Sequence, residues 1–376
     1  MTNNWVHTIT TDYEPARLLA HIETAVTFDD VQLIPRLSNI ESRGNVKTAS
    51  TFTTNFSIDK PIIAAPMDSV CDARMASALW SHGCVGVLHR FCSVEEQVKM
   101  VELVKHSIDS RSHLITKGFR TTNPVIAAAV GANGDMAHRS RQLIKAGANV
   151  LVIDVAHGHH LNVKKAIETI IAIRDELNVV VDIVAGNIAT VEAALELESW
   201  GADALRVGIG GGAVCETRIR TGVGIPQLTA VDNITSRTSL PVISDGGIRY
   251  PGDVVKAIAC GADTVMIGSL LAGTDEAPGD VFVGGQWPNT KNFKMYRGSA
   301  SATIKMQKSG HQNHVEGAAK MVESKGSVIR VIDDIMDGVK SAMSYLGTDD
   351  LDELCSVAEF VRISGAGLRE AHPHLL

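Results

Sequence analysis

The stretch from Gly208 to Gly224, GIGGGAVCETRIRTGVG, combines four closely spaced glycines with a single cysteine. Glycines allow backbone N–H and C=O groups to approach a ligand closely. Cys215 follows them in a polar setting beside Arg218 and Arg220, whose positive charges would favour a thiolate. A thiolate is a good nucleophile toward an electrophilic carbon such as an amidine-like ring position. The loop is therefore predicted to present a catalytic thiol.

Two other interpretations of this loop are weaker. GIGGGA fits a loose dinucleotide-binding pattern, GxGxxA, but the polar CETRIRTGVG that follows is not the apolar helix that such a site needs. A free cysteine is often an ordinary buried residue, and this interpretation suits Cys84 and Cys260 because both lie in apolar runs. The polar surroundings of Cys215 set it apart from them.

Composition excludes several classes of partner. The chain has 376 residues, 45% of them hydrophobic and 20% charged, with a formal net charge of −7. Its basic residues are scattered, which gives no reason to expect nucleic-acid or membrane-surface binding, so small molecules are the expected partners. Six cysteines without a CxxC pair argue against a zinc ribbon or a disulfide framework. Without a signal peptide or a membrane-length apolar run, a cytoplasmic location is expected.

Eight short apolar runs, bounded by Gly, Asp or Pro and separated by segments of helical spacing, predict buried parallel strands. Six runs carry a polar residue at the carboxyl end, where a barrel builds its site. The sequence therefore favours an α/β fold with a single (β/α)8 TIM barrel over a doubly wound sheet. The runs are 61–67, 84–89, 124–130, 149–155, 179–186, 203–209, 241–247 and 263–269, and the polar residues are Asp68, His89, Asp154, Asn187, Asp245 and Ser269.

One domain is expected, with extensions on both sides of the barrel core. The N-terminal extension contains the motif TFDDVQLIP. After the barrel come a polar, glycine-dotted segment, expected to be a mobile lid or binding flap, and an amphipathic helix in VIDDIMDGVKSAMSYL. The expected bounds are 1–376 for the domain, about 57–275 for the barrel core, 1–55 for the N-terminal extension, about 280–376 for the flap and tail, and Gly284–Gly326 for the polar segment.

Seven motifs resemble, in order and spacing, those of the IMP dehydrogenase/GMP reductase family. They are TFDDVQLIP, AAPMDSV, VIDVAHGH, VAGNI, GIGGGAVCETR…TGVGIPQLTAV, VISDGGI…GDVVKAIACGADTVMIGSLLAG and MYRG, and they cover nearly the whole chain. The resemblance implies a homotetramer of (β/α)8 barrels. It also implies that the loop cysteine attacks C2 of a purine mononucleotide to form a covalent thioimidate, with hydride exchanged with a nicotinamide cofactor.

The same resemblance implies roles for individual residues. Cys215 is the nucleophile, and Asp245 holds the ribose hydroxyls, as suits a carboxylate facing a diol. Glycine turns with free N–H groups suit a dianionic phosphate. The residues implied around the substrate are Ser69, Asp245, Gly246, Gly247, Gly268, Ser269, Tyr296, Arg297 and Gly298, and those implied for the cofactor and the purine pocket are Arg90, Asp154 and Asn187.

Within the family, three features favour the branch that reduces GMP to IMP and ammonia with NADPH. TGVGIPQ has the form typical of reductases. The flap Arg–Tyr pair with which dehydrogenases activate water has no counterpart between Met306 and Gly326. Too few residues separate His89 from Ile126 for the regulatory CBS insert that is common in dehydrogenases.

A reductase needs a proton relay that turns the 2-amino group of GMP into leaving ammonia. Thr217 lies two residues after the nucleophile, and Glu323 lies in MVESKG. A carboxylate hydrogen-bonded to a hydroxyl is a plausible relay for this step. The resemblance assigns the relay to Thr217 and Glu323, with Glu316 as the rival carboxylate.

Other features resemble the dehydrogenase branch, which oxidises IMP with NAD. The C-terminal FVRISGAGLREAHPH is similar to tails that donate carbonyls to a K+ site in a neighbouring subunit. DEAPGD is also similar to dehydrogenases. IMP dehydrogenase is therefore the alternative activity, and an idle purine-nucleotide-binding protein is a second alternative. Two residues depart from the family pattern, since Ala213 stands where both branches place a phosphate-binding serine and Arg90 where a lysine is usual. The implied K+ ligands are the carbonyls of Gly210, Gly212, Cys215, Glu370, Ala371 and His372.

Overall fold

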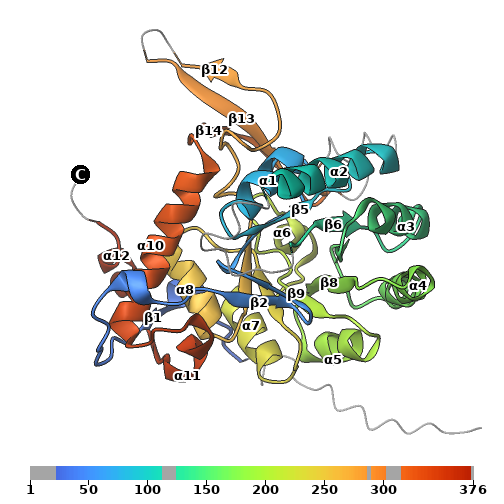
Figure 1. Ribbon diagram of the computed structural model, residues 1–376. Helices are drawn as coiled ribbons and strands as arrows, with labels where there is room; N and C mark the ends of the chain where they lie inside the picture. Colours follow the sequence, from blue (N-terminus) through green and yellow to red (C-terminus); the bar gives the residue numbers. More distant parts are fainter. Residues whose placement is uncertain (1–22, 112–123, 286–288, 302–314, 374–376) are drawn as a thin grey trace, which may run out of the picture.

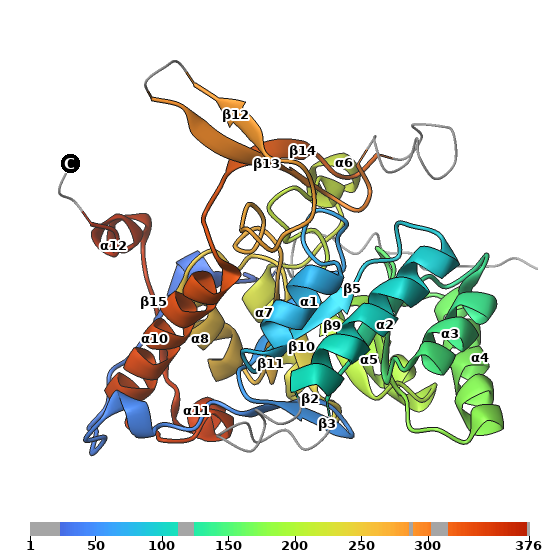
Figure 2. The ribbon, with the colours of Figure 1, turned by 45° about the horizontal axis from the view of Figure 1, so that its top comes forward.

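The computed structural model describes residues 23–111, 124–285, 289–301 and 315–373. Eight parallel strands close into a barrel in the order β10-β11-β4-β5-β6-β7-β8-β9, and helices surround it (Figures 1 and 2). The closed barrel confirms the (β/α)8 prediction and excludes the doubly wound sheet. Each predicted run overlaps one strand: β4 (Ile62–Ala64), β5 (Val85–Leu88), β6 (Ala127–Val130), β7 (Val150–Asp154), β8 (Asp182–Ile188), β9 (Ala204–Val207), β10 (Val242–Asp245) and β11 (Thr264–Ile267).

Alternation along the strands divides the apolar core into two layers. Ile63 of β4 belongs to the cluster inside the barrel, whereas Ile62 and Ala64 belong to the larger cluster between strands and helices. None of the helices in the described ranges is long and apolar enough to span a membrane. The outer helices are α1 (Ala73–Trp80), α2 (Val94–Arg111), α3 (Met136–Ala146), α4 (Leu161–Leu177), α5 (Val191–Ser199), α7 (Gln227–Thr235), α8 (Pro251–Ala259) and α10 (Val328–Leu346).

The two extensions meet at the barrel wall. Strand β1 (Val31–Leu33) of the N-terminal extension pairs antiparallel with β15 (Phe360–Arg362) of the tail. The hairpin of β2 (Ser50–Thr53) and β3 (Phe56–Ile58) adds its apolar side chains to the cluster inside the barrel. This hairpin therefore closes the amino end of the barrel. The carboxyl ends of the strands, where a barrel carries its site, lie at the opposite end.

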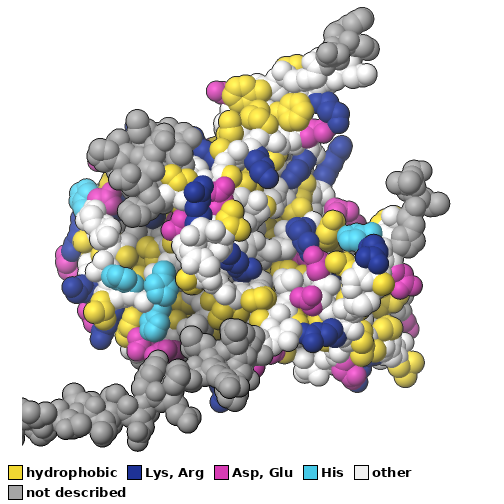
Figure 3. All heavy atoms as spheres, turned by 180° about the vertical axis from the view of Figure 1, so that it is seen from behind, with side chains coloured by type: hydrophobic (Ala, Val, Ile, Leu, Met, Phe, Trp, Pro, Cys, Tyr) yellow, Lys and Arg dark blue, Asp and Glu magenta, His cyan; other side chains and the backbone are white. Residues whose placement is uncertain are grey.

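An arm projects from the barrel after β11 (Figure 1). It is an antiparallel sheet of β12 (Phe282–Gly284), β13 (Lys291–Arg297) and β14 (Ala319–Glu323). Apolar side chains are exposed on it (Figure 3). Among them is the cross-strand pair Met295 and Met321. Two segments of the predicted flap, Lys291–Arg297 and Ala319–Glu323, are thus strands of a regular sheet. The dehydrogenase Arg–Tyr pair is missing from the sequence between Met306 and Gly326, and residues 306–314 of that segment lie outside the described residues.

The arm is anchored to the barrel by a buried lysine. Lys294 of β13 is 5% exposed, and its Nζ donates to the carbonyl oxygens of Thr274 at 2.9 Å and Ala277 at 2.7 Å. Burial lowers the pKa of this ammonium group. Hydrogen bonds to the loop after β11 compensate for its desolvation, so β13 enters the site at a fixed position.

Asp263, just before β11, leads to a prediction about stability and pH. Burial raises the pKa of its carboxyl to about 6, against the hydrogen bond that it accepts from the Val242 N–H at 2.7 Å. Because the folded pKa lies above the unfolded value, ionisation destabilises the fold progressively between about pH 4 and pH 6, fully above about pH 6, and has no effect well below pH 4. We expect Asp263→Asn to raise the free energy of unfolding at pH 8 by about 1–3 kcal/mol and to change it little at pH 4. Urea unfolding at both pH values measures this, and an equal effect at each would contradict it.

Candidate active site

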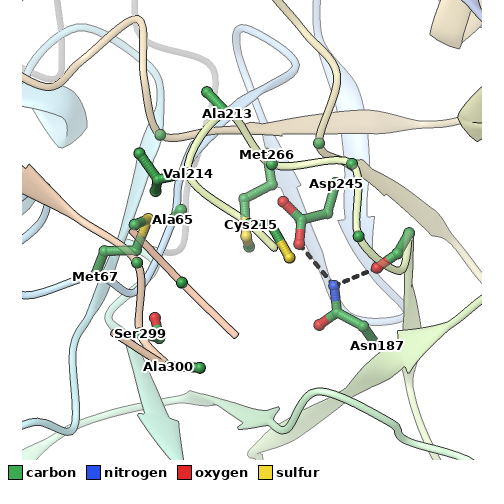
Figure 4. A pocket seen from close by; sticks show the side chains of 18 of the residues that line it. Ala65, Met67, Asn187, Ala213, Val214, Cys215, Asp245, Met266, Ser299 and Ala300 are labelled. Atoms are coloured by element: carbon green, nitrogen blue, oxygen red, sulfur yellow. Dashed lines mark hydrogen bonds between the residues drawn. The ribbon is translucent and has the colours of Figure 1, made fainter. Parts of the chain in front are cut away.

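Cys215 lies at a cavity of about 420 Å³ at the carboxyl ends of the barrel strands, on the loop between β9 and α6 (Thr217–Thr221) (Figure 4). Its side chain is exposed. The loop passes so close to β10 that a Cβ on Gly208, whose φ is +144°, would collide with the carbonyl oxygen of Asp245. Glycine is therefore required here by the protein's own backbone as well as by access for a ligand.

A hydroxyl and a carboxylate continue from the thiol in a hydrogen-bonded row. The Cys215 Sγ donates to the Thr217 Oγ1 at 3.2 Å, and Thr217 Oγ1 donates to the Glu316 Oε2 at 2.7 Å. Glu316 is held there by its backbone, since its carbonyl oxygen accepts from the Glu216 N–H at 2.8 Å and the Ala318 N–H donates to the Val214 carbonyl at 2.8 Å. The row can carry a proton between the reacting centre and a carboxylate.

The expectation for Glu323 needs correction. Glu323 is on β14 of the arm, where its Oε2 accepts from Lys291 Nζ at 2.9 Å, and its side chain is 52% exposed. It does not line the cavity, whereas Glu316, the rival carboxylate, does. The structure therefore places Glu316 beside Thr217.

The two arginines next to the thiol in sequence point elsewhere. Arg218 donates from Nε to the Ile209 carbonyl at 3.0 Å and from Nη2 to the Ile225 carbonyl at 2.6 Å. Arg220 pairs with Glu216 at 2.7 Å, one helical turn away. Both guanidinium groups brace the loop, and these contacts do not support the expectation that their charges act on the thiol.

A buried arginine that the sequence argument missed lies at the centre of the polar wall. Arg206 of β9 is 7% exposed. It donates from Nη1 to Asp154 Oδ1 at 2.7 Å and from Nε to Asp245 Oδ2 at 2.8 Å. Burial opposes its charge, but the two carboxylates outweigh burial and hold the pKa of the guanidinium above its usual value. The available signal was an arginine inside the apolar run DALRVGI.

Asn187 and Arg90 complete this wall. Asn187 Nδ2 donates to Asp245 Oδ2 at 2.7 Å and to the Gly208 carbonyl at 2.8 Å (Figure 4). Arg90 donates from Nη2 to the Asp154 carbonyl at 2.9 Å, and its Nε lies 3.5 Å from Asp154 Oδ2. Arg90, Asp154 and Asn187, implied as cofactor and purine contacts, therefore lie together on one wall of the cavity.

Most of the residues implied around the substrate also line the cavity. Gly246 and Gly247 form a turn with φ of +101° and +81°. The Phe28 ring packs so closely against this turn that a Cβ on Gly247 would lie 3.0 Å from a ring carbon. Tyr296 is buried, and burial, followed by the nearby Asp245 and Cys215, raises the pKa of its hydroxyl. The lining includes Asp245, Gly246, Gly247, Gly268, Ser269, Tyr296 and Gly298.

Ser69 and Arg297 are not among the residues that line the cavity. Arg297 forms an ion pair with Asp68. The Ser69 hydroxyl accepts from the Arg297 N–H at 3.1 Å. These contacts fasten the end of β13 to the loop after β4, so the two residues hold Tyr296 and Gly298 in place.

The carbonyls implied as a K+ site are divided between two parts of this chain. Gly210 and Gly212 belong to the cysteine loop, and the Gly212 carbonyl accepts from the Cys215 N–H at 3.0 Å. The tail contains α12 (Gly365–Glu370), and the His372 ring that follows it lies 5.9 Å from the ring of Tyr250. The implied site joins neighbouring subunits, so it stays a prediction.

The closed barrel and the thiol-bearing cavity at its carboxyl end define a (β/α)8-barrel enzyme. Residues 25–374 match the family model of the IMP dehydrogenase / GMP reductase domain, and the chain belongs to that family. Members are oxidoreductases that act on purine nucleotides with a nicotinamide cofactor, NAD or NADPH.

Relatives of both names are similar to more than nine-tenths of the chain. It is 37% identical to the inosine-5′-monophosphate dehydrogenase of Borreliella burgdorferi, over 93% of this chain and 96% of that one. It is 31% identical to the GMP reductase of Leishmania donovani, over 95% and 98% of the two chains. A crystal structure of a cysteine-to-alanine variant of Trypanosoma brucei GMP reductase, in complex with guanosine 5′-monophosphate, matches with a TM-score of 0.83 and 30% identity, over 95% of this chain and 99% of that one.

Proposed function

We propose that this protein is a GMP reductase that converts GMP to IMP and ammonia, with NADPH as reductant, through a covalent adduct on Cys215. The observation that carries the proposal is the row from the Cys215 sulfur through Thr217 to Glu316. A hydroxyl and a carboxylate beside the thiol suit protonation of a departing amine. The TGVGIPQ motif and the lack of a flap Arg–Tyr pair, which would activate water, favour the reductase over the dehydrogenase.

In the first step, the sulfur bonds to C2 of GMP, the C2=N3 π electrons move to N3, and the thiol proton passes through Thr217 to Glu316. Glu316 returns this proton through Thr217 to the 2-amino group. The bond between C2 and the 2-amino nitrogen then breaks as the C2=N3 double bond re-forms, and ammonia leaves behind a thioimidate between Cys215 and the purine. When bound, a nicotinamide cofactor would supply the hydride that converts this adduct to IMP. Breakage of the C–S bond regenerates the thiolate.

The wall formed by Arg90 and Asp154 fits a nicotinamide nucleotide. The Arg90 Nε is buried without a hydrogen-bond partner in the described part of the chain. A buried donor of this kind needs an acceptor, and the amide and ribose groups of the cofactor offer several. Arg90 and Asp154 would hold the cofactor, and Asn187 would separate it from the ribose of GMP.

The phosphate of GMP would lie at the glycine turns. Gly246, Gly247, Gly268 and Ser269 line the cavity and present backbone there, and the Tyr296 side chain closes the same region. Backbone N–H groups suit a dianion. Ala213 offers no hydroxyl to it, so the turns and Tyr296 carry the phosphate contacts.

The test is an absorbance assay at the nicotinamide band with two substrate pairs. We expect GMP with NADPH to yield IMP and ammonia, and IMP with NAD+ to yield no XMP. Oxidation of IMP without reduction of GMP would make the protein an IMP dehydrogenase, the second candidate, which the 37% identity to the Borreliella burgdorferi enzyme favours. Nucleotide binding without either reaction would indicate the idle binding protein.

The homotetramer, the cytoplasmic location and the K+ site are parts of the same proposal. The tetramer would bring Glu370, Ala371 and His372 of one chain to Gly210 and Gly212 of another. Light scattering measures the mass in solution. Comparison of turnover in K+ and Na+ buffers measures the dependence on the ion.

A further inference from the structure

Arg206 has no role in the chemistry proposed above, although it occupies the centre of the site. We propose that Arg206 is a positioning residue that orients the Asp245 carboxylate toward the ribose hydroxyls and ties it to Asp154 on the cofactor side. The inference rests on the proposed binding of a purine ribonucleotide. It concerns the sugar, and it is independent of whether the base is guanine or hypoxanthine.

The four groups involved lie on four consecutive strands of the barrel. Asp154 ends β7, Asn187 is on β8, Arg206 is on β9 and Asp245 ends β10. Gly186 of β8 makes room for the arginine, because a Cβ there would lie 2.7 Å from Arg206 Cβ and 2.6 Å from its carbonyl oxygen. The backbone of the neighbouring strand is therefore fitted to this buried side chain.

The hydrogen bonds to Asp245 all reach one oxygen. Arg206 Nε and Asn187 Nδ2 both donate to Oδ2, at 2.8 and 2.7 Å. The described residues supply no donor to Oδ1, which is therefore available to accept from a ribose diol. With Oδ2 held from two sides, the carboxylate cannot rotate, so its second oxygen has a fixed direction.

The other end of the same guanidinium fixes the cofactor side. Nη1 donates to Asp154 Oδ1 at 2.7 Å, and Asp154 in turn contacts Arg90. The planar fork of arginine holds its donors in fixed, separated directions that here reach two carboxylates, whereas a lysine ammonium is a compact point charge without that fixed geometry. Without Arg206, two largely buried carboxylates lose their shared counter-ion and reorient.

The experiment measures recognition of the sugar without turnover. In a Cys215→Ala background, calorimetry gives the dissociation constants of GMP and 2′-deoxy-GMP. We expect the protein to bind GMP about tenfold or more tightly than 2′-deoxy-GMP. Arg206→Met is expected to remove this preference, because it weakens the binding of GMP about tenfold and has little effect on the binding of the deoxy form. Arg206→Lys is expected to restore part of the preference, because it keeps the charge but not the fork.

Arg174→Met is the matched control. Arg174 of α4 also pairs with an aspartate, Asp203, at 3.2 Å, but it does not line the cavity. Its loss is expected to lower the melting temperature and to leave the preference for GMP unchanged. If Arg206→Met does not fold, Arg206→Lys and Arg206→Gln carry the test, with loss of preference expected to be larger for the neutral side chain.

The possible failures are distinguishable. Undiminished preference for GMP over the deoxy form in folded Arg206→Met or Arg206→Gln overturns the inference alone. If IMP binds and GMP does not, IMP and 2′-deoxy-IMP replace the pair, and the same criterion holds. If neither nucleotide binds the Cys215→Ala protein, the proposed function fails and the inference fails with it.

Discussion

Cys215→Ala is expected to lower kcat for the nucleotide by at least ~10⁴-fold, which is the usual effect of removing a catalytic nucleophile. The sulfur is the only atom of the row that can bond to C2 of the purine, since the Thr217 hydroxyl lies beyond it and donates onward to Glu316. The nucleotide should still bind, because the contacts to ribose and phosphate come from Asp245 and the glycine turns. Steady-state assays give kcat, and calorimetry gives the affinity.

Cys355→Ala is the control for this substitution. Cys355 is also exposed, but it lies on α11 (Leu354–Val357), where partial desolvation of its sulfur and then the nearby Asp232 raise the pKa of the thiol. We expect the variant to keep wild-type turnover. Intact-protein mass spectrometry should detect a nucleotide adduct on the wild-type protein and on Cys355→Ala. Unchanged turnover by Cys215→Ala would remove the covalent route.

The barrel could be predicted because its strands leave a local signature. A parallel strand covered on both faces reads as a continuous apolar run, as in the VLVID of β7. Asp154, Asn187 and Asp245 then meet at one cavity, since closure of the barrel brings the carboxyl ends of its strands together. The position of each side chain along its own strand was enough to place it at the site.

The residues that were missed depend on contacts between distant segments. Arg206 looks like an anomaly within an apolar strand until β7 and β10 supply its two carboxylates. Arg218 and Arg220 are neighbours of the thiol in sequence, but the turn of α6 sends Arg220 back to Glu216. Sequence distance is therefore a poor guide to which charges face the sulfur.

The choice between Glu316 and Glu323 shows the same limit. Both lie in a polar, glycine-dotted stretch with no apolar period to fix the register. What decides between them is the backbone pairing of the Glu216 N–H with the Glu316 carbonyl at 2.8 Å, together with the strand pairing that gives Glu323 to the arm. Neither of these backbone pairings can be predicted from residue spacing in the sequence.

Glu316→Gln is expected to slow release of ammonia from GMP by about 10²–10⁴-fold, the usual contribution of a positioned acid or base. Glutamine can still accept the hydrogen bond from Thr217 but cannot take up or return the proton. Thr217→Ala should act in the same direction, because it interrupts the row between sulfur and carboxylate. Rapid quench with an ammonia assay measures this step.

The hydride step can be followed separately, because IMP with NADP+ reaches the same thioimidate without ammonia. Its burst of nicotinamide absorbance should be much less affected by Glu316→Gln than ammonia release is. Glu323→Gln makes the same chemical change on the arm, where the carboxylate pairs with Lys291, and should leave both steps near wild type. Equal slowing of the two steps by Glu316→Gln would mean that Glu316 maintains the conformation of the loop and does not transfer the proton. A larger defect in Glu323→Gln than in Glu316→Gln would mean that the flap rearranges around the bound nucleotide.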